Sequence, residues 1–80
     1  MHEISLAENI IQLIECAARR DKFSVVRTVF IDIGTHSCVS PDALAFCFES
    51  VAKGGMAENA RLEISTTPGD EMRVRELEVI

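Results

Sequence analysis

The stretch Phe23–Gly34 reads FSVVRTVFIDIG, and it decides the fold. It is rich in β-branched and aromatic residues and ends in a glycine, which is typical of a β-strand. Alternate positions from Val25 to Ile33 are mostly apolar, whereas the other face mixes Phe30 with Asp32. We therefore expect a strand with one face packed on the core and the other face partly covered.

A helix is expected before this strand, over Glu3–Arg20. Apolar residues recur there at spacings of three and four, and basic residues near its end complement the helix dipole. Ser5 and Glu8 have the spacing of a capping box, so the helix starts either at Ser5 or at the very N-terminus, and the sequence does not separate the two.

A second helix is expected after the strand. Ser40, Pro41 and Asp42 supply an N-cap, a first-turn proline and a first-turn acid. The apolar pattern then continues to Ala52, and the pair at 54–55 (GG) ends the helix.

Two more strands are expected, over Ala60–Thr66 and Glu71–Ile80. The residues between them, 67–70 (TPGD), form a turn, and we expect the two strands to pair as an antiparallel hairpin. In the last strand the apolar residues change parity near Arg75 and Glu76, which predicts a β-bulge or a change in which side of the strand is buried. Its alternating charges indicate a solvated strand face or edge.

The predicted order is helix, strand, helix, strand, strand. The first two strands are joined through a helix, so we expect them to be parallel, with the hairpin adding an antiparallel neighbour. The predicted fold class is α+β, a three-stranded mixed sheet packed on one face by two helices.

Composition excludes several classes of protein. A chain of 80 residues allows one domain, and 48% hydrophobic with 26% charged residues is globular. A net charge of −5 and the absence of Trp and Tyr argue against nucleic-acid binding. No signal peptide or bilayer-spanning segment is visible, so we expect a soluble cytoplasmic protein. The sequence shows no pair of acid and base residues of the kind that catalysis uses, so we do not expect an enzyme.

The chain carries an odd number of cysteines, Cys16, Cys38 and Cys47, and no Cys-x-x-Cys pair. A secreted disulfide framework and a four-cysteine zinc site are both disfavoured. We expect reduced thiols that behave as small hydrophobic residues.

The N-terminal residues Met1, His2 and Glu3 are a candidate metal site. A bulky second residue should leave Met1 in place, so a free amine, an amide and an imidazole follow one another. Such nitrogens suit square-planar Ni(II) or Cu(II). A backbone nitrogen at a helix start can serve as a ligand without breaking a helical hydrogen bond. By spacing alone, an exposed histidine is the simpler interpretation.

The opening residues 1–6 (MHEISL) resemble the start of the hydrogenase-maturation nickel metallochaperones, the HypA/HybF family. Later stretches resemble further parts of that family: 29–34 (VFIDIG), 37–39 (SCV), 43–49 (ALAFCFE) and 69–79 (GDEMRVRELEV). The resemblance implies that nickel is held by the amine of Met1, the imidazole of His2 and backbone nitrogens of His2 and Glu3. Glu3 could instead supply an outer carboxylate or only a favourable charge.

Members of this family also carry a zinc-binding domain with two Cys-x-x-Cys pairs, inserted before the last strand. Here the chain runs straight through 65–72 (STTPGDEM) without such a pair. We infer that residues 1–80 are a nickel-binding domain whose zinc domain has been removed, with the junction near 68–71. Engineering is the simplest origin, and a natural shortened paralogue is the alternative.

Other polar and aromatic residues have simpler interpretations. We expect His36 to be an exposed loop histidine and Cys38 and Cys47 to be packed or partly exposed thiols. We expect Phe46 and Phe48 to lie in the core and at its rim.

The resemblance implies a non-enzymatic metallochaperone that delivers Ni(II) for [NiFe]-hydrogenase maturation. Its implied partners are the GTPase of that pathway and the hydrogenase large subunit. The alternative is a structural or interaction fragment that forms a homodimer by strand exchange.

Overall fold

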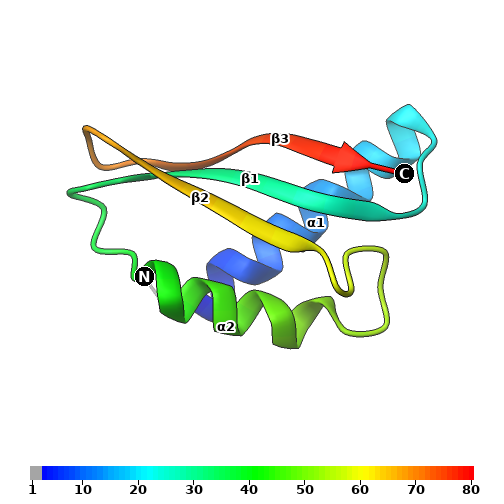
Figure 1. Ribbon diagram of the computed structural model, residues 1–80, viewed down its shortest axis with the longest axis horizontal. Helices are drawn as coiled ribbons and strands as arrows, with labels where there is room; N and C mark the ends of the chain where they lie inside the picture. Colours follow the sequence, from blue (N-terminus) through cyan, green and yellow to red (C-terminus); the bar gives the residue numbers. More distant parts are fainter. Residues whose placement is uncertain (1–2) are drawn as a thin grey trace.

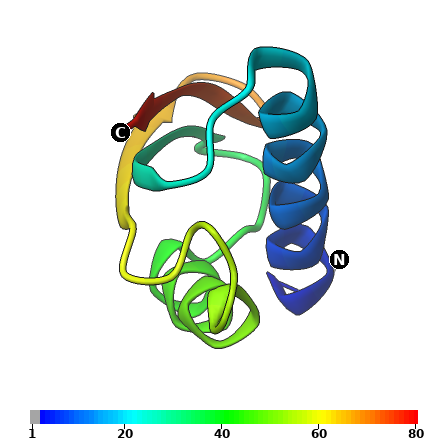
Figure 2. The same ribbon diagram turned by 90° about the vertical axis from the view of Figure 1, so that its right-hand side faces the viewer.

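The computed structural model describes residues 3–80. Its elements are helix α1 (Glu3–Asp21), strand β1 (Val26–Gly34), helix α2 (Pro41–Ala52), strand β2 (Arg61–Thr67) and strand β3 (Met72–Val79). Both helices pack on one face of a three-stranded mixed sheet, as Figure 1 and Figure 2 show. This confirms the predicted fold class. Within residues 3–80, no helix is both long enough and apolar enough to cross a membrane.

The helix ends follow the expected signals with two differences. Glu3 is already helical, so the alternative start at Ser5 is wrong. Helix α1 ends one residue beyond the prediction, where Lys22 adopts a left-handed conformation (φ 60°) and its N–H donates to the Ala18 carbonyl at 2.8 Å. At the start of α2, the Ser40 hydroxyl accepts a hydrogen bond from the Ala43 N–H at 3.3 Å, which confirms the N-cap.

The order of the strands corrects one prediction. The sheet runs β2-β1-β3, with β1 parallel to β2 and antiparallel to β3. The expected hairpin between β2 and β3 is therefore wrong, because the two strands lie on opposite sides of β1. The connection at 68–71 crosses the end of β1 to reach the other edge (Figure 1).

Gly34 makes this crossing possible. Its N–H donates to the Glu71 carbonyl at 2.7 Å, and the next two N–H groups donate to the carbonyls of Thr67 and Gly69 at 2.9 and 2.8 Å. A Cβ atom on Gly34 would lie 2.4 Å from the Gly69 oxygen, which no side chain tolerates. The absence of a side chain lets the two backbones approach this closely.

The predicted bulge in β3 is confirmed. Phe30 of β1 faces Glu76, whereas the next residue, Ile31, faces Val74, so Arg75 is the extra residue. A second irregularity lies in β1 between Val26 and Thr28. It buries Val26 and leaves Val25 exposed, whereas simple alternation predicted Val25 on the packed face.

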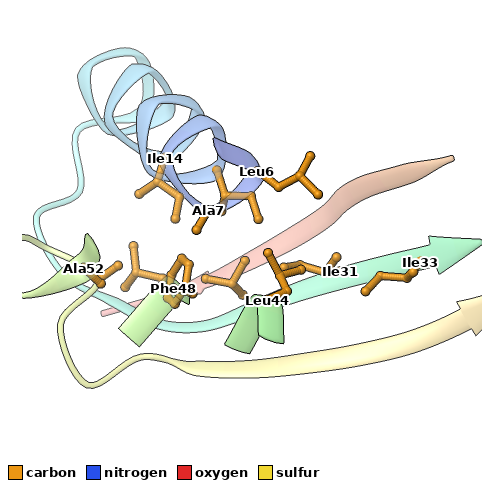
Figure 3. Close-up of a cluster of buried hydrophobic side chains, with 12 residues drawn as sticks. Leu6, Ala7, Ile14, Ile31, Ile33, Leu44, Phe48 and Ala52 are labelled. Carbon is orange, nitrogen blue, oxygen red and sulfur yellow. The ribbon is translucent and has the colours of Figure 1, made fainter. Parts of the chain in front are cut away.

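The core lies between the sheet and the two helices. Ile31 and Ile33 of β1 belong to one buried cluster with Ile14 of α1 and Phe48 of α2, part of which Figure 3 shows, and these four are almost fully buried. None of the helices formed by residues 3–80 covers the opposite face of the sheet (Figure 2).

Candidate metal centre

The residues predicted to bind nickel lie at the beginning of the chain. Met1 and His2 are outside the described residues, so their positions stay predictions. Glu3 is the first described residue of α1 and is half-buried.

Glu3 ties the start of α1 to the start of α2. Its carboxylate Oε2 accepts a hydrogen bond from the Ser40 backbone N–H at 3.1 Å. Ser40 is itself the N-cap of α2. The two helices therefore begin at the same end of the molecule, and the Glu3 side chain takes part in holding them there. An anionic carboxylate at two helix starts is also stabilised by both helix dipoles.

Sequence reasoning missed this role of Ser40. It identified Ser40 only as the cap of its own helix, because capping is local and its signal lies within four residues. The contact with Glu3 spans 37 residues, and only the folded chain creates it. No signal local to either segment predicts the contact.

The loop between β1 and α2 closes this end of the molecule. His36 is exposed, and its backbone N–H donates to the Gly69 carbonyl at 2.8 Å. Cys38 is exposed and has a φ of 63°. A groove of about 340 Å³ runs beside the loop, lined by Leu6, Ser37, Val39, Asp70, Glu71 and Met72. The groove brings the start of α1, this loop and the crossing at 68–71 to one place.

The described residues offer no second metal centre. In the range 3–80, no three His, Cys, Asp or Glu side chains come together as a metal-binding group. Cys16 on α1 and Cys38 in the loop before α2 are exposed free thiols, unlike the small hydrophobic residues expected, and Cys47 on α2 is half-buried. The Cys16 sulfur accepts a hydrogen bond from Arg19 at 3.3 Å.

The two neighbouring phenylalanines of α2 have different environments. Phe48 is 2% exposed and belongs to the core, whereas Phe46 is 77% exposed on the solvent side of the helix. The prediction of a core residue is confirmed for Phe48, and Phe46 lies further out than a rim position.

A pair of shifted pKa values lies at the other end of α1. The guanidinium of Arg20 donates two hydrogen bonds to the Asp21 carboxylate, at 3.0 and 3.2 Å. This contact lowers the pKa of Asp21 and raises the pKa of Arg20. At 1.5 Å per residue, Asp21 lies roughly 27 Å along α1 from Glu3.

Comparison with known proteins decides the family. A family model described as hydrogenase/urease nickel incorporation metallochaperone, hypA, matches residues 1–72. The chain belongs to the HypA family. The hydrogenase maturation factor HypA of Albidiferax ferrireducens is 55% identical over 69 residues, which cover 86% of this chain and 61% of that protein. The HypA of Dechloromonas aromatica is 51% identical with the same coverage.

Two further HypA proteins extend the comparison. The HypA of Rhodopseudomonas palustris strain BisB5 is 38% identical over 112 residues, which cover 99% of both chains. That alignment is longer than the present chain, so this relative carries residues that have no counterpart here. The solution structure of the Ni metallochaperone HypA from Helicobacter pylori matches with a TM-score of 0.90 at 21% identity, covering 100% of this chain and 98% of that one. At this identity, the match supports the fold alone.

The chain spans about 61% of the length of the first of these HypA relatives. The matched range includes residues 1–3, where the sequence placed the metal site. These relatives are named hydrogenase maturation factors.

Proposed function

We propose that this chain is a nickel-binding metallochaperone domain that accepts Ni(II) at its N-terminus and passes it on during [NiFe]-hydrogenase maturation. The family match across residues 1–72 carries the proposal. The proposed ligands are the amine of Met1, the imidazole of His2, and the backbone nitrogens of His2 and Glu3. The nickel ion is cargo, and the domain performs no catalysis.

The geometry around Glu3 supports a backbone ligand at this residue. The Glu3 carboxylate already accepts a hydrogen bond from the Ser40 N–H. This contact positions the helix start, while the main chain of residues 1–3 supplies nitrogen ligands. Nitrogen ligands in a square-planar arrangement favour Ni(II) or Cu(II) over harder ions.

We propose further that these 80 residues are the nickel-binding domain of the family without its zinc-binding domain. The junction is at 68–71, where the chain crosses from β2 to β3. The proposed partners are the maturation GTPase and the hydrogenase large subunit, and the proposed compartment is the cytoplasm. The R. palustris relative aligns over 112 residues and so has residues that this chain lacks, which supports the absence of a domain here.

Calorimetric titration of untagged protein with Ni(II) tests the terminal site. We expect one ion per chain and no bound zinc. His2→Ala, or one residue added before Met1, should weaken binding by at least about a hundredfold, which corresponds to roughly 2.7 kcal/mol. His36→Ala is the matched control, because the chain has two histidines and His36 lies in a loop beyond β1. Unchanged binding in His2→Ala, or an equal loss in His36→Ala, refutes the terminal site.

The role of Glu3 is tested separately. Glu3→Ala keeps the backbone nitrogen and removes the carboxylate. We expect the visible absorbance of the nickel complex to be unchanged and the affinity to fall by less than about tenfold. A changed spectrum would instead identify the carboxylate as a ligand.

Nickel affinity should depend on pH. The amine and the imidazole bind metal only when neutral, and their ordinary pKa values are about 7.7–8.0 and 6.5. Binding therefore releases protons, weakens as the pH falls below neutrality and recovers above it. Titrations at pH 6 and pH 8 measure this difference, and equal affinities would contradict nitrogen ligation.

The second proposal is a strand-exchanged homodimer, in which β3 of one chain pairs with β1 of another. The exposed edges of β2 and β3 favour it. Exchange requires the crossing at 68–71 to open, which breaks its two hydrogen bonds, from the Gly34 N–H to Glu71 and from the His36 N–H to Gly69. Light scattering over a range of concentrations tests this proposal, and a strictly monomeric protein would exclude it.

A further inference from the structure

Strand β3 leaves one backbone edge without a neighbouring strand. It is the outer strand of the sheet and pairs with β1 on one side, and the other side faces solvent (Figure 1). Such an edge presents backbone N–H and C=O groups in a row that can pair with another strand. The question is which strand fits this edge.

The bulge determines which way the side chains of β3 point. Because Arg75 is the extra residue, Arg75 and Glu76 both lie on the open face of the sheet. Arg75 contacts Asp32 at 3.3 Å and its guanidinium lies 5.3 Å from the Phe30 ring centre, and both residues belong to that face. The open face of β3 carries Arg73, Arg75, Glu76 and Glu78, and the helix face carries Met72, Val74, Leu77 and Val79.

This arrangement is complementary to itself. In an antiparallel pair of two β3 strands with the twofold axis between residues 75 and 76, Arg75 faces Glu76 and Arg73 faces Glu78. On the helix face, Val74 then lies opposite Leu77. Every pair joins opposite charges or two apolar side chains, and such cross-strand pairs stabilise a sheet.

The bulge is essential to this match. In a regular strand, residues 73 and 78 point to opposite faces, because successive side chains alternate. The bulge reverses the alternation at 75–76, so the paired residues share a face. A shift of one residue places Arg75 opposite Arg75, or Glu76 opposite Glu76, and brings apolar residues opposite charged ones.

The other edge strand matches charges only in a short register: paired with itself about Leu62, Arg61 lies opposite Glu63, but only residues 61–63 of β2 overlap. When β2 is paired with itself about Ile64, Glu63 lies opposite Ser65 and Arg61 opposite Thr67, so no charges are matched. Pairing about Glu63 brings two carboxylates together. Self-complementarity over a whole strand is therefore a property of β3 and not of β2.

The surface beneath β3 also suits a second copy. A groove of about 380 Å³ lies between α1 and β3, with Ala17 and Leu77 among its lining residues. Leu13 and Val79 also line it and are 48% and 42% exposed. A second β3 strand would bring its own apolar row beside these residues and cover them.

We propose that β3 pairs antiparallel with β3 of a second copy, joining the two three-stranded sheets into one continuous sheet across a twofold axis. The intramolecular pairing of β1 with β3 is kept, which distinguishes this dimer from strand exchange. Pairing along one eight-residue strand buries less surface than a standard interface, so the dimer is weak and forms at high protein concentration.

Two charge variants and their mixture test the proposal by sedimentation velocity. The basic variant is E76K/E78K. The acidic variant is R73E/R75E with D32N, which removes the carboxylate that Arg73 and Arg75 contact. In either variant alone, four pairs join like charges, so we expect self-association to weaken by about tenfold or more. In the mixture every charged pair is opposite, so we expect a heterodimer.

The outcomes separate the models. Monomeric variants and a mixed heterodimer support edge pairing. A mixture that stays monomeric overturns it, and so does undiminished self-association of either variant. Strand exchange places β3 against β1 of the other chain, so mixing cannot restore it. D32N alone is the control and should associate like the parent chain.

Amide hydrogen exchange on the unmodified chain gives an independent measurement. Edge pairing protects β3 amides that exchange freely in the monomer, and this protection rises with protein concentration. Strand exchange adds no such protection, because β3 keeps a single neighbour. Concentration-independent exchange in β3 overturns the proposal, even if one of the charge variants fails to fold. Neither measurement uses nickel, so the result is separate from the terminal metal site.

Discussion

Gly34→Ala should be strongly destabilising, because the crossing at 68–71 lies directly over this residue. The added Cβ would meet the Gly69 oxygen at 2.4 Å, the Gly69 carbonyl carbon at 2.7 Å and the Asp70 nitrogen at 2.9 Å. Ordinary contacts begin near 3.4 Å, so the crossing must move by about 1 Å. All three contacts are backbone atoms, which cannot rotate away as a flexible side chain could.

The magnitude follows from the overlap and the hydrogen bonds. Overpacking of this kind costs about 1–3 kcal/mol. Moving the crossing also strains its bonds to residues 34–36, each contributing about 0.5–1.5 kcal/mol. We expect a loss of about 2–5 kcal/mol in the free energy of unfolding. A chain of this length has roughly 4–12 kcal/mol in total, so the variant is partly unfolded or close to it.

Urea unfolding followed by far-ultraviolet circular dichroism measures this loss, because the chain has no Trp or Tyr for fluorescence. Gly55→Ala is the matched control. A Cβ there meets only the Ala52 oxygen at 3.5 Å, and its φ is not left-handed. We expect that variant to be neutral or more stable by about 0.4–1 kcal/mol. A loss below about 0.5 kcal/mol in Gly34→Ala would refute the close approach.

Three further changes test local features. Lys22→Gly should raise stability by about 1 kcal/mol, because Lys22 is left-handed and glycine adopts that conformation without strain; an unchanged melting temperature would contradict this. Ser40→Ala removes the cap of α2 and should cost about 1 kcal/mol in urea unfolding, while Ser50→Ala on the exposed side of the same helix serves as its control. Asp21→Asn should lower the urea midpoint slightly at pH 7 and leave it unchanged at pH 2. The pKa of Asp21 is lowered in the folded protein, so its charged form stabilises the fold at pH values above its ordinary pKa. This stabilisation is lost as the pH falls through the pKa of the folded state. An equal effect of the substitution at both pH values would exclude the ion pair.

Much of the candidate site could be read from local sequence. The motif at residues 1–3 needs no long-range contact, since its amine, amides and imidazole are adjacent in the chain. The contact between Glu3 and Ser40 was not predictable, because it joins two helix starts that only the sheet brings together. The same holds for the groove beside residues 37–39, which is assembled from three separate segments.

The sequence by itself determined the number, type and approximate ends of the elements. Periodicity, caps and glycines act within a few residues, so they specify α1, α2 and the three strands, and even the parity change at Arg75. Tertiary structure alone decided the neighbours of each strand. Whether β3 pairs with β2 or β1 depends on the close approach of Gly34 and Gly69, which lie 35 positions apart in the chain. The central place of β1 follows from burying its helix-side face while both of its edges pair, an energy that no local pattern contains.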